Sequence, residues 1–194
     1  DKRTTFGELD RQSNQIANGL REAGLGPGAR VAVLAMDSDD VFKLLFGIAK
    51  AGCVFTGINW RLAPAEIRYI LENGEVEALF VDAERYSLGL ELASELPGIH
   101  LVQSFAEFET WSTQQAAEDP GLPEDPERIF AQLYTSGTTG NPKGVRLANR
   151  SFFAVVRSMA EQGDDWIGWE PRDCTLFNIP SFHIGGLWWA MTTL

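Results

Sequence analysis

Hydroxyl-bearing residues and glycines surround one lysine between Leu133 and Val145, in the segment LYTSGTTGNPKGV. Glycine lets the backbone approach a ligand closely, and successive backbone N–H groups can line a concave anion site. Serine and threonine hydroxyls donate to phosphate oxygens, and lysine adds a compact positive charge. The residue types therefore favour a phosphate-binding loop. A surface turn can have the same composition, so composition alone leaves both interpretations open.

Two phosphate-binding patterns with fixed spacing do not match this loop. The P-loop requires a glycine, four further residues and then Gly-Lys-Ser/Thr. Counted from Gly137, the sixth position is Pro142, and Gly144 follows Lys143 where a hydroxyl residue is required. The dinucleotide-binding fingerprint begins G-x-G, and Gly137 and Gly140 do not have that spacing. The spacing therefore excludes both patterns.

Charge and composition limit the other classes of function. The formal net charge of -11 at pH 7 argues against nucleic acid or an anionic membrane as the main partner. No apolar run is long enough to span a bilayer or resembles a secretory signal. With two histidines and two widely separated cysteines, the chain has too few ligands for a His/Cys zinc site and no disulfide framework. We expect a cytoplasmic protein.

Strand-like and helix-like segments alternate around the loop. We expect helices that begin near Thr5, which can form a capping box with Glu8, and near Ser38, Pro64 and Asn149. Short apolar runs predict strands at residues 31–35, 53–58, 77–82, 99–102, 129–135 and 174–179. The alternation predicts an α/β fold of layered βαβ units, with a largely parallel sheet covered on both faces.

Two further stretches bear on domain organisation. Residues 118–128 are rich in proline and acidic residues, and we expect an internal surface loop that bridges two halves of one fold. The final segment, GGLWWAMTTL, is an apolar run that needs a partner to bury it. We therefore expect the chain to be a piece of a longer protein.

The order of residues in YTSGTTGNPKGV closely resembles the phosphate-binding signature of the adenylate-forming (acyl-activating) enzyme superfamily. Its members include acyl-CoA and aryl-CoA synthetases, luciferases and the adenylation domains of peptide synthetases. Residues 4–38, 47–82 and 177–187 resemble further blocks of the same family in the right order, so the resemblance covers essentially the whole chain. The NWRL segment, residues 59–62, leans toward the acyl-CoA synthetases.

The resemblance implies that residues 1–194 are the N-terminal part of an AMP-binding (adenylation) domain, in an incomplete acyl-CoA synthetase fold. The residues that would surround the ATP phosphates are Thr135, Ser136, Gly137, Thr138, Thr139, Gly140 and Lys143. Lys143 would neutralise charge on the departing pyrophosphate. Phe182, His183 and Gly185 would border the acyl or carboxylate pocket. Taken alone, a histidine between Phe182 and Ile184 is more often a core residue.

The implied reaction has two steps. A carboxylate attacks the α-phosphate of Mg-ATP to give an acyl-adenylate and pyrophosphate, and the thiol of coenzyme A then takes the acyl group. The expected partners are thus ATP, Mg²⁺, coenzyme A as co-substrate, and a fatty or other apolar carboxylic acid, with no metal ligand in these residues. The family's catalytic lysine matches nothing in this chain, so we expect the chain alone to be inactive.

Other assignments remain open. An aryl-acid ligase or a peptide-synthetase adenylation domain would use the same chemistry. A non-catalytic nucleotide-binding module belongs to a different class. Arg146 and Asn149 depart from residues that are common in the family, although asparagine is a good N-cap for the helix that follows.

Overall fold

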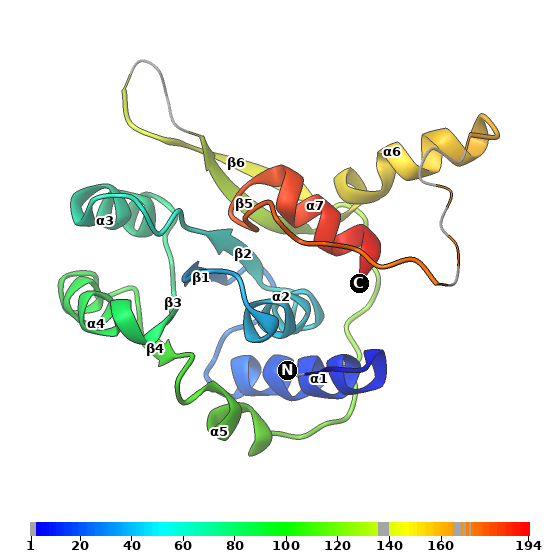
Figure 1. The fold of residues 1–194 in the computed structure, drawn as a ribbon. Helices are drawn as coiled ribbons and strands as arrows, with labels where there is room; N and C mark the ends of the chain where they lie inside the picture. Colours follow the sequence, from blue (N-terminus) through cyan, green and yellow to red (C-terminus); the bar gives the residue numbers. More distant parts are fainter. Residues whose placement is uncertain (1–2, 136–139, 165–167, 169, 171) are drawn as a thin grey trace.

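The computed structural model describes residues 3–135, 140–164, 168, 170 and 172–194. These residues form a six-stranded sheet in the order β4-β3-β1-β2-β5-β6 (Figure 1). Neighbouring strands pair in parallel, except for the antiparallel pair β5–β6. The predicted α/β fold with a largely parallel sheet is confirmed.

The bounds of the elements follow the predicted alternation. The strands are β1 (Arg30–Leu34), β2 (Val54–Gly57), β3 (Ala78–Val81), β4 (Leu101–Ser104), β5 (Ile129–Thr135) and β6 (Lys143–Ala148). The helices are α1 (Phe6–Glu22), α2 (Asp39–Ala51), α3 (Pro64–Asn73), α4 (Tyr86–Glu95), α5 (Phe108–Thr113), α6 (Asn149–Glu161) and α7 (Ile184–Thr193), with a 3₁₀ turn η1 (Ala83–Arg85).

The first two helices begin where the polar residues predict. Thr5 caps α1, and Glu8 completes the capping box by accepting a hydrogen bond from the Thr5 backbone N–H at 2.8 Å. This backbone hydrogen bond is the main cause of the lowered pKa of Glu8, and the Thr5 hydroxyl adds to it. Ser38 caps α2, and Gly52 ends that helix in the left-handed conformation at φ 77°.

The central strands β1, β2 and β3 are buried on both faces of the sheet, and β1 shows how their side chains divide. Val31 and Val33 pack in the core shared with α1, α2 and α7. Ala32 and Leu34 pack in the core shared with α3 and α4. Figure 1 shows α3 and α4 on one side of the sheet and α1 and α2 on the other. A parallel strand that is covered on both faces has apolar residues at every position. This burial explains the continuous apolar run from which β1 was predicted.

The predicted strand at residues 174–179 is wrong, because this segment has no regular structure. Leu176 and Ile179 are 77% and 49% exposed, while Phe177 packs on Phe42 with ring centroids 5.1 Å apart. A strand requires a neighbour that takes its backbone hydrogen bonds, and in the described residues no sheet strand pairs with this segment. An apolar run alone cannot reveal that lack of a partner.

The predicted N-cap of α6 is displaced by one residue. Asn149 is the first residue of the helix, and Ala148 occupies the cap position without a side-chain hydrogen bond. The Asn149 amide instead donates to the backbone oxygen of Asp125 at 2.9 Å. Asn149 therefore ties the start of α6 to the segment before β5.

Residues 118–128 run between α5 and β5 without helix or strand. Polar side chains of α1 hold this segment: Asn18 donates to the backbone oxygen of Glu118 at 3.0 Å, and Arg21 to that of Pro120 at 2.6 Å. The segment is thus attached to the surface of the first half of the fold. Of the helices in the described part of the chain, none has the length and apolarity needed to cross a membrane.

Candidate active site

The phosphate-loop segment connects the two strands of the antiparallel pair β5–β6. Thr135 at the end of β5 is in register with Lys143 at the start of β6. The pair extends beyond the rest of the sheet, at the edge where the parallel strands β1 and β2 also end (Figure 1). Ligands of open α/β sheets bind at this carboxyl edge. The predicted residues Ser136, Gly137, Thr138 and Thr139 lie outside the described residues.

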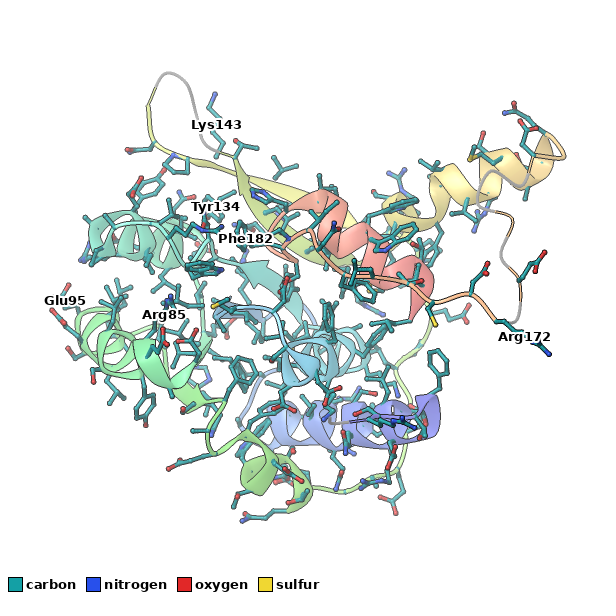
Figure 2. All side chains as sticks on the ribbon, viewed as in Figure 1. Arg85, Glu95, Tyr134, Lys143, Arg172 and Phe182 are labelled. Carbon is teal, nitrogen blue, oxygen red and sulfur yellow. The ribbon has the colours of Figure 1, made fainter. Side chains whose placement is uncertain are left out.

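The two ends of the loop expose the groups predicted to meet phosphate. Thr135 and Lys143 are both exposed, and Figure 2 shows the Lys143 side chain at the outer end of the pair. Gly140 has φ 141°, a backbone conformation in which a residue with a side chain would be strained. An exposed ammonium, a hydroxyl and a glycine backbone are suited to a phosphate group.

A hydrogen-bonded group fixes the base of the loop. The Tyr134 hydroxyl donates to the Asn73 side-chain oxygen at 2.9 Å and accepts from the Gln132 amide at 3.0 Å. A Cβ at Gly144 would lie 2.8 Å from the Gln132 amide nitrogen and 3.1 Å from the Tyr134 ring. Burial is the main cause of the raised pKa of Tyr134, so the phenol stays protonated as a donor. The loop is therefore anchored to the end of α3.

A cavity of about 130 Å³ lies beside the loop. Its lining comes from the end of β2, the start of α3, the end of β5 and the segment before α7: Gly57, Asn59, Leu62, Glu66, Ile70, Tyr134, Thr135, Pro142, Phe182 and His183. The structure thus brings the predicted phosphate residue Thr135 together with the predicted acyl-pocket residues Phe182 and His183. Gly185 is exposed in the first turn of α7 and is not one of the lining residues, so its role stays a prediction.

Sequence reasoning did not assign Asn59, Leu62, Glu66 and Ile70 to the site. They follow β2 at the carboxyl edge of the sheet, and the NWRL segment was a signal for Asn59 and Leu62 only, since Glu66 and Ile70 lie on α3. Glu66 also accepts a hydrogen bond from the Ala63 backbone N–H at 2.9 Å, which satisfies a free donor at the start of α3. The wall of the cavity is therefore built on a capped helix.

Phe182 and His183 differ in exposure although their ring centroids lie 4.4 Å apart. Phe182 is 7% exposed and packs against Gly57, where a Cβ would lie 2.7 Å from the Phe182 Cα. His183 is exposed and precedes α7. His183 is therefore not a core histidine, and it lines the cavity while exposed to solvent.

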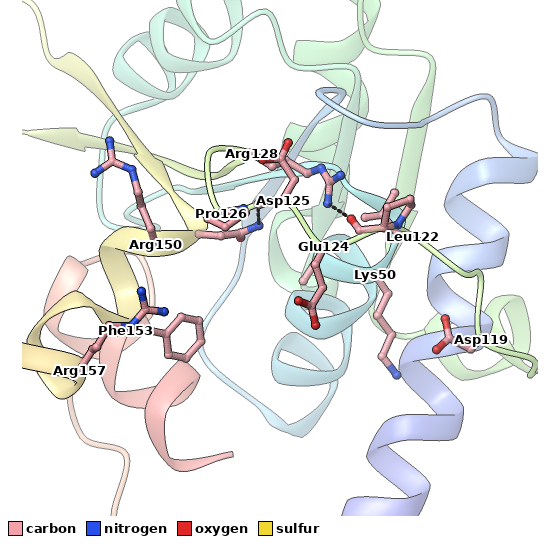
Figure 3. Close-up of a pocket in the computed structure, with 13 residues that line it drawn as sticks. Lys50, Asp119, Leu122, Glu124, Asp125, Pro126, Arg128, Arg150, Phe153 and Arg157 are labelled. Atoms are coloured by element: carbon pink, nitrogen blue, oxygen red, sulfur yellow. Dashed lines mark hydrogen bonds between the residues drawn. The ribbon is translucent and has the colours of Figure 1, made fainter. Parts of the chain in front are cut away.

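A second hollow, of about 440 Å³, lies at the opposite end of the β5–β6 pair (Figure 3). Its walls carry basic and acidic side chains together: Lys50, Arg128, Arg150, Arg157, Asp119, Glu124 and Asp125. Arg128 donates to the backbone oxygen of Pro123 at 3.0 Å, and Arg150 pairs with Glu127 at 2.8 Å. These bonds stabilise the segment before β5, far from the loop.

Residues 1–194 match the family of AMP-binding enzymes. The chain belongs to the AMP-binding enzyme family. Among the relatives of this AMP-binding protein is the fatty acid–[acyl-carrier-protein] ligase ScoC of Streptomyces coeruleorubidus, 45% identical over 96% of the chain and 36% of ScoC. The ligase MmaC of Mycobacterium marinum, which carries the same description, is 33% identical over 97% of the chain and 36% of MmaC.

Solved structures that include a fatty acyl CoA synthetase of Mycobacterium tuberculosis, with a TM-score of 0.87 at 26% identity, have the same fold as this chain. The inhibitor-bound N-terminal domain of FACL13 from Mycobacterium tuberculosis superposes with a TM-score of 0.88 at 27% identity, over 98% of the chain and 48% of that structure. The chain spans about a third of the length of the curated relatives, at 36% of ScoC.

Proposed function

We propose that the whole protein is an ATP-dependent ligase that joins a fatty acid to a thiol through an acyl-adenylate. One observation carries this proposal: a single cavity is lined by Thr135 of the phosphate loop and by Phe182 and His183. An acyl-adenylate unites a phosphate and an acyl group, so its formation requires both kinds of site side by side. Proximity of this kind supplies a large share of the rate in such reactions.

The residues present fit the phosphates of ATP. The Lys143 ammonium would lie beside the β- and γ-phosphates and stabilise charge on the leaving pyrophosphate. The Thr135 hydroxyl would donate to a phosphate oxygen. Mg²⁺ would neutralise further phosphate charge when bound with ATP. Within the described residues there is no group of three or more acidic, histidine or cysteine side chains that could hold a metal, so we assign no magnesium ligand.

The cavity favours an apolar carboxylic acid. Leu62, Ile70 and Phe182 supply apolar walls, and the exposed His183 lines the same cavity. ScoC and MmaC are both described as fatty acid–[acyl-carrier-protein] ligases. We therefore propose a fatty acid as the substrate and the thiol of an acyl-carrier protein as the acceptor, with coenzyme A as the alternative acceptor.

The test is carboxylate-dependent exchange between ATP and pyrophosphate in the full-length protein, across a panel of acids. Exchange with fatty acids, followed by transfer to a carrier protein rather than to coenzyme A, is the expected result. Transfer to coenzyme A alone would contradict the proposed acceptor. The absence of exchange with every acid would contradict the ligase function and favour a non-catalytic nucleotide-binding module.

An aryl acid is the second candidate substrate. The 3-hydroxybenzoate–CoA ligase of Aromatoleum sp. is 32% identical over 96% of the chain. The panel therefore includes 3-hydroxybenzoate, and a preference for it over fatty acids would replace the proposed substrate. The chain of residues 1–194, tested alone, is expected to give no exchange.

A further inference from the structure

Asp37 and Ser181 are joined by two hydrogen bonds although they are far apart in the sequence. The Ser181 backbone N–H donates to Oδ2 of Asp37 at 2.9 Å, and the Ser181 hydroxyl donates to Oδ1 at 2.5 Å. Asp37 follows β1 at the carboxyl edge of the sheet, and Ser181 immediately precedes Phe182. One carboxylate thus uses both oxygens to hold the segment that carries Phe182 and His183.

The segment is also fitted against the sheet at its next residue. Ser181 is 5% exposed and Phe182 is 7% exposed. Phe182 lies so close to Gly57 that a Cβ at position 57 would be 2.7 Å from the Phe182 Cα. The carboxylate of Asp37 and the bare backbone of Gly57 therefore fix successive residues of one segment.

Local structure gives the segment little support of its own. Residues 174–179 before it have no helix or strand, and Ile179 is 49% exposed. After it, α7 begins without a side-chain hydrogen bond at its cap residue, His183. The local contacts are a turn, in which the His183 backbone N–H donates to the Pro180 oxygen at 3.0 Å, and the close packing of Gly186 on the Ile179 and Pro180 oxygens. Hydrogen bonds to a charged acceptor are stronger than neutral ones, so the two Asp37 bonds hold Ser181 more strongly than the turn hydrogen bond does.

We propose that Asp37 is a positioning residue for the acyl pocket. It acts through Ser181, and it sets Phe182 and His183 at the cavity wall so that the carboxylic acid is held beside the phosphate loop. This inference rests on the proposed ligase function. It assigns to Asp37 an effect on the acid and not on ATP, because Lys143 and Thr135 lie on the β5–β6 pair, which Asp37 does not contact through these bonds.

The experiment measures ATP–pyrophosphate exchange in the full-length protein, with the acid and ATP varied separately. Asp37→Ala is expected to raise KM for the fatty acid about tenfold or more, with KM for ATP within about twofold of wild type. Asp37→Asn retains an acceptor oxygen for the Ser181 N–H, and it is expected to restore KM for the acid to within about threefold. Glu22→Ala, a change at an exposed acid on α1, is the control and should match wild type.

Ser181→Ala keeps the test decisive if Asp37→Ala does not fold. It removes the hydroxyl hydrogen bond and keeps the backbone one, so KM for the acid should rise by about three- to tenfold. Wild-type exchange combined with an unchanged KM for the acid in Ser181→Ala or Asp37→Ala would overturn the positioning role. Equal losses for acid and ATP would also overturn it, since they indicate general destabilisation. Wild-type protein without exchange would instead refute the ligase function on which the inference rests.

Discussion

The Tyr134 hydroxyl donates a hydrogen bond to the Asn73 side-chain oxygen over 2.9 Å, and this bond joins β5, the strand before the predicted phosphate loop, to the last residue of α3. Helix α3 also supplies Glu66 and Ile70 to the cavity wall. The loop and the cavity wall therefore share one support. Figure 2 shows Tyr134 between α3 and the β5–β6 pair.

Tyr134→Phe should weaken both stability and ATP use. The change leaves the Asn73 oxygen and the Gln132 amide without their shared partner, so we expect unfolding to become easier by about 1–2 kcal/mol. KM for ATP should rise, since the base of the loop is no longer fixed. Urea unfolding and exchange kinetics of the full-length protein measure the two effects. Tyr86→Phe on α4 is the control, and an equal effect there would contradict the role of this bond.

Gly57→Ala should impair the acyl pocket. The new Cβ would lie 2.7 Å from the Phe182 Cα and 3.0 Å from the Phe55 ring, so the backbone of the 180–183 segment must move. Overpacking of this kind costs about 1–3 kcal/mol, and we expect KM for the acid to rise about tenfold. Gly98→Ala, where the nearest atom is 3.7 Å away, is the matched control. Wild-type kinetics of Gly57→Ala would contradict a role of the close contact between Gly57 and Phe182 in binding the acid.

The sequence predicted the central strands β1, β2 and β3 well because they are buried on both faces. The continuous apolar runs at β1 and β3 are flanked by turn residues, and this pattern indicates buried strands. The run at residues 174–179 has a similar composition, yet no described strand pairs with it. An apolar composition predicts that a segment is buried. It does not predict whether a neighbouring strand is available to pair with that segment.

The sequence named only part of the lining of the candidate cavity, for a related reason. Thr135, Phe182 and His183 belong to contiguous motifs, and the cavity brings them together. The contacts that hold them, Asp37 with Ser181 and Tyr134 with Asn73, join residues distant in the chain. The periodicity of a sequence relates only residues within one helix or strand. It therefore cannot predict contacts between residues that are far apart in the sequence.

The two cysteines of the chain should react very differently. Burial, aided by the nearby Glu77, raises the pKa of the Cys53 thiol to about 12, against a smaller opposing effect of Arg21. The thiolate is the reactive form, so Cys53 should resist alkylation in the native protein at pH 8. Cys174 is exposed and should be alkylated readily. Peptide mass spectrometry after iodoacetamide treatment, with and without denaturant, measures both sites.

The same thiol predicts a loss of stability at alkaline pH. Because the folded pKa lies above the unfolded one, the unfolded state releases its proton first as pH rises. The contribution of Cys53 is therefore complete below about pH 9 and is lost between there and about 12. Cys53→Ala should reduce the slope of unfolding free energy against pH in this window. An unchanged slope would show that other groups govern the alkaline loss.

Lys143→Ala should reduce exchange by about tenfold to a hundredfold, because one positive charge beside the developing pyrophosphate is lost. Lys143 opens β6 and is paired in register with Thr135, whereas Arg146 is in register with Gln132, further from the loop. Both side chains are exposed, so Arg146→Ala is a control that removes the same charge at a different distance. We expect its exchange to stay within about twofold of wild type. Equal losses of exchange in the two variants would show that the overall charge of β6 causes the effect. That result would contradict a specific role of Lys143 at the phosphates.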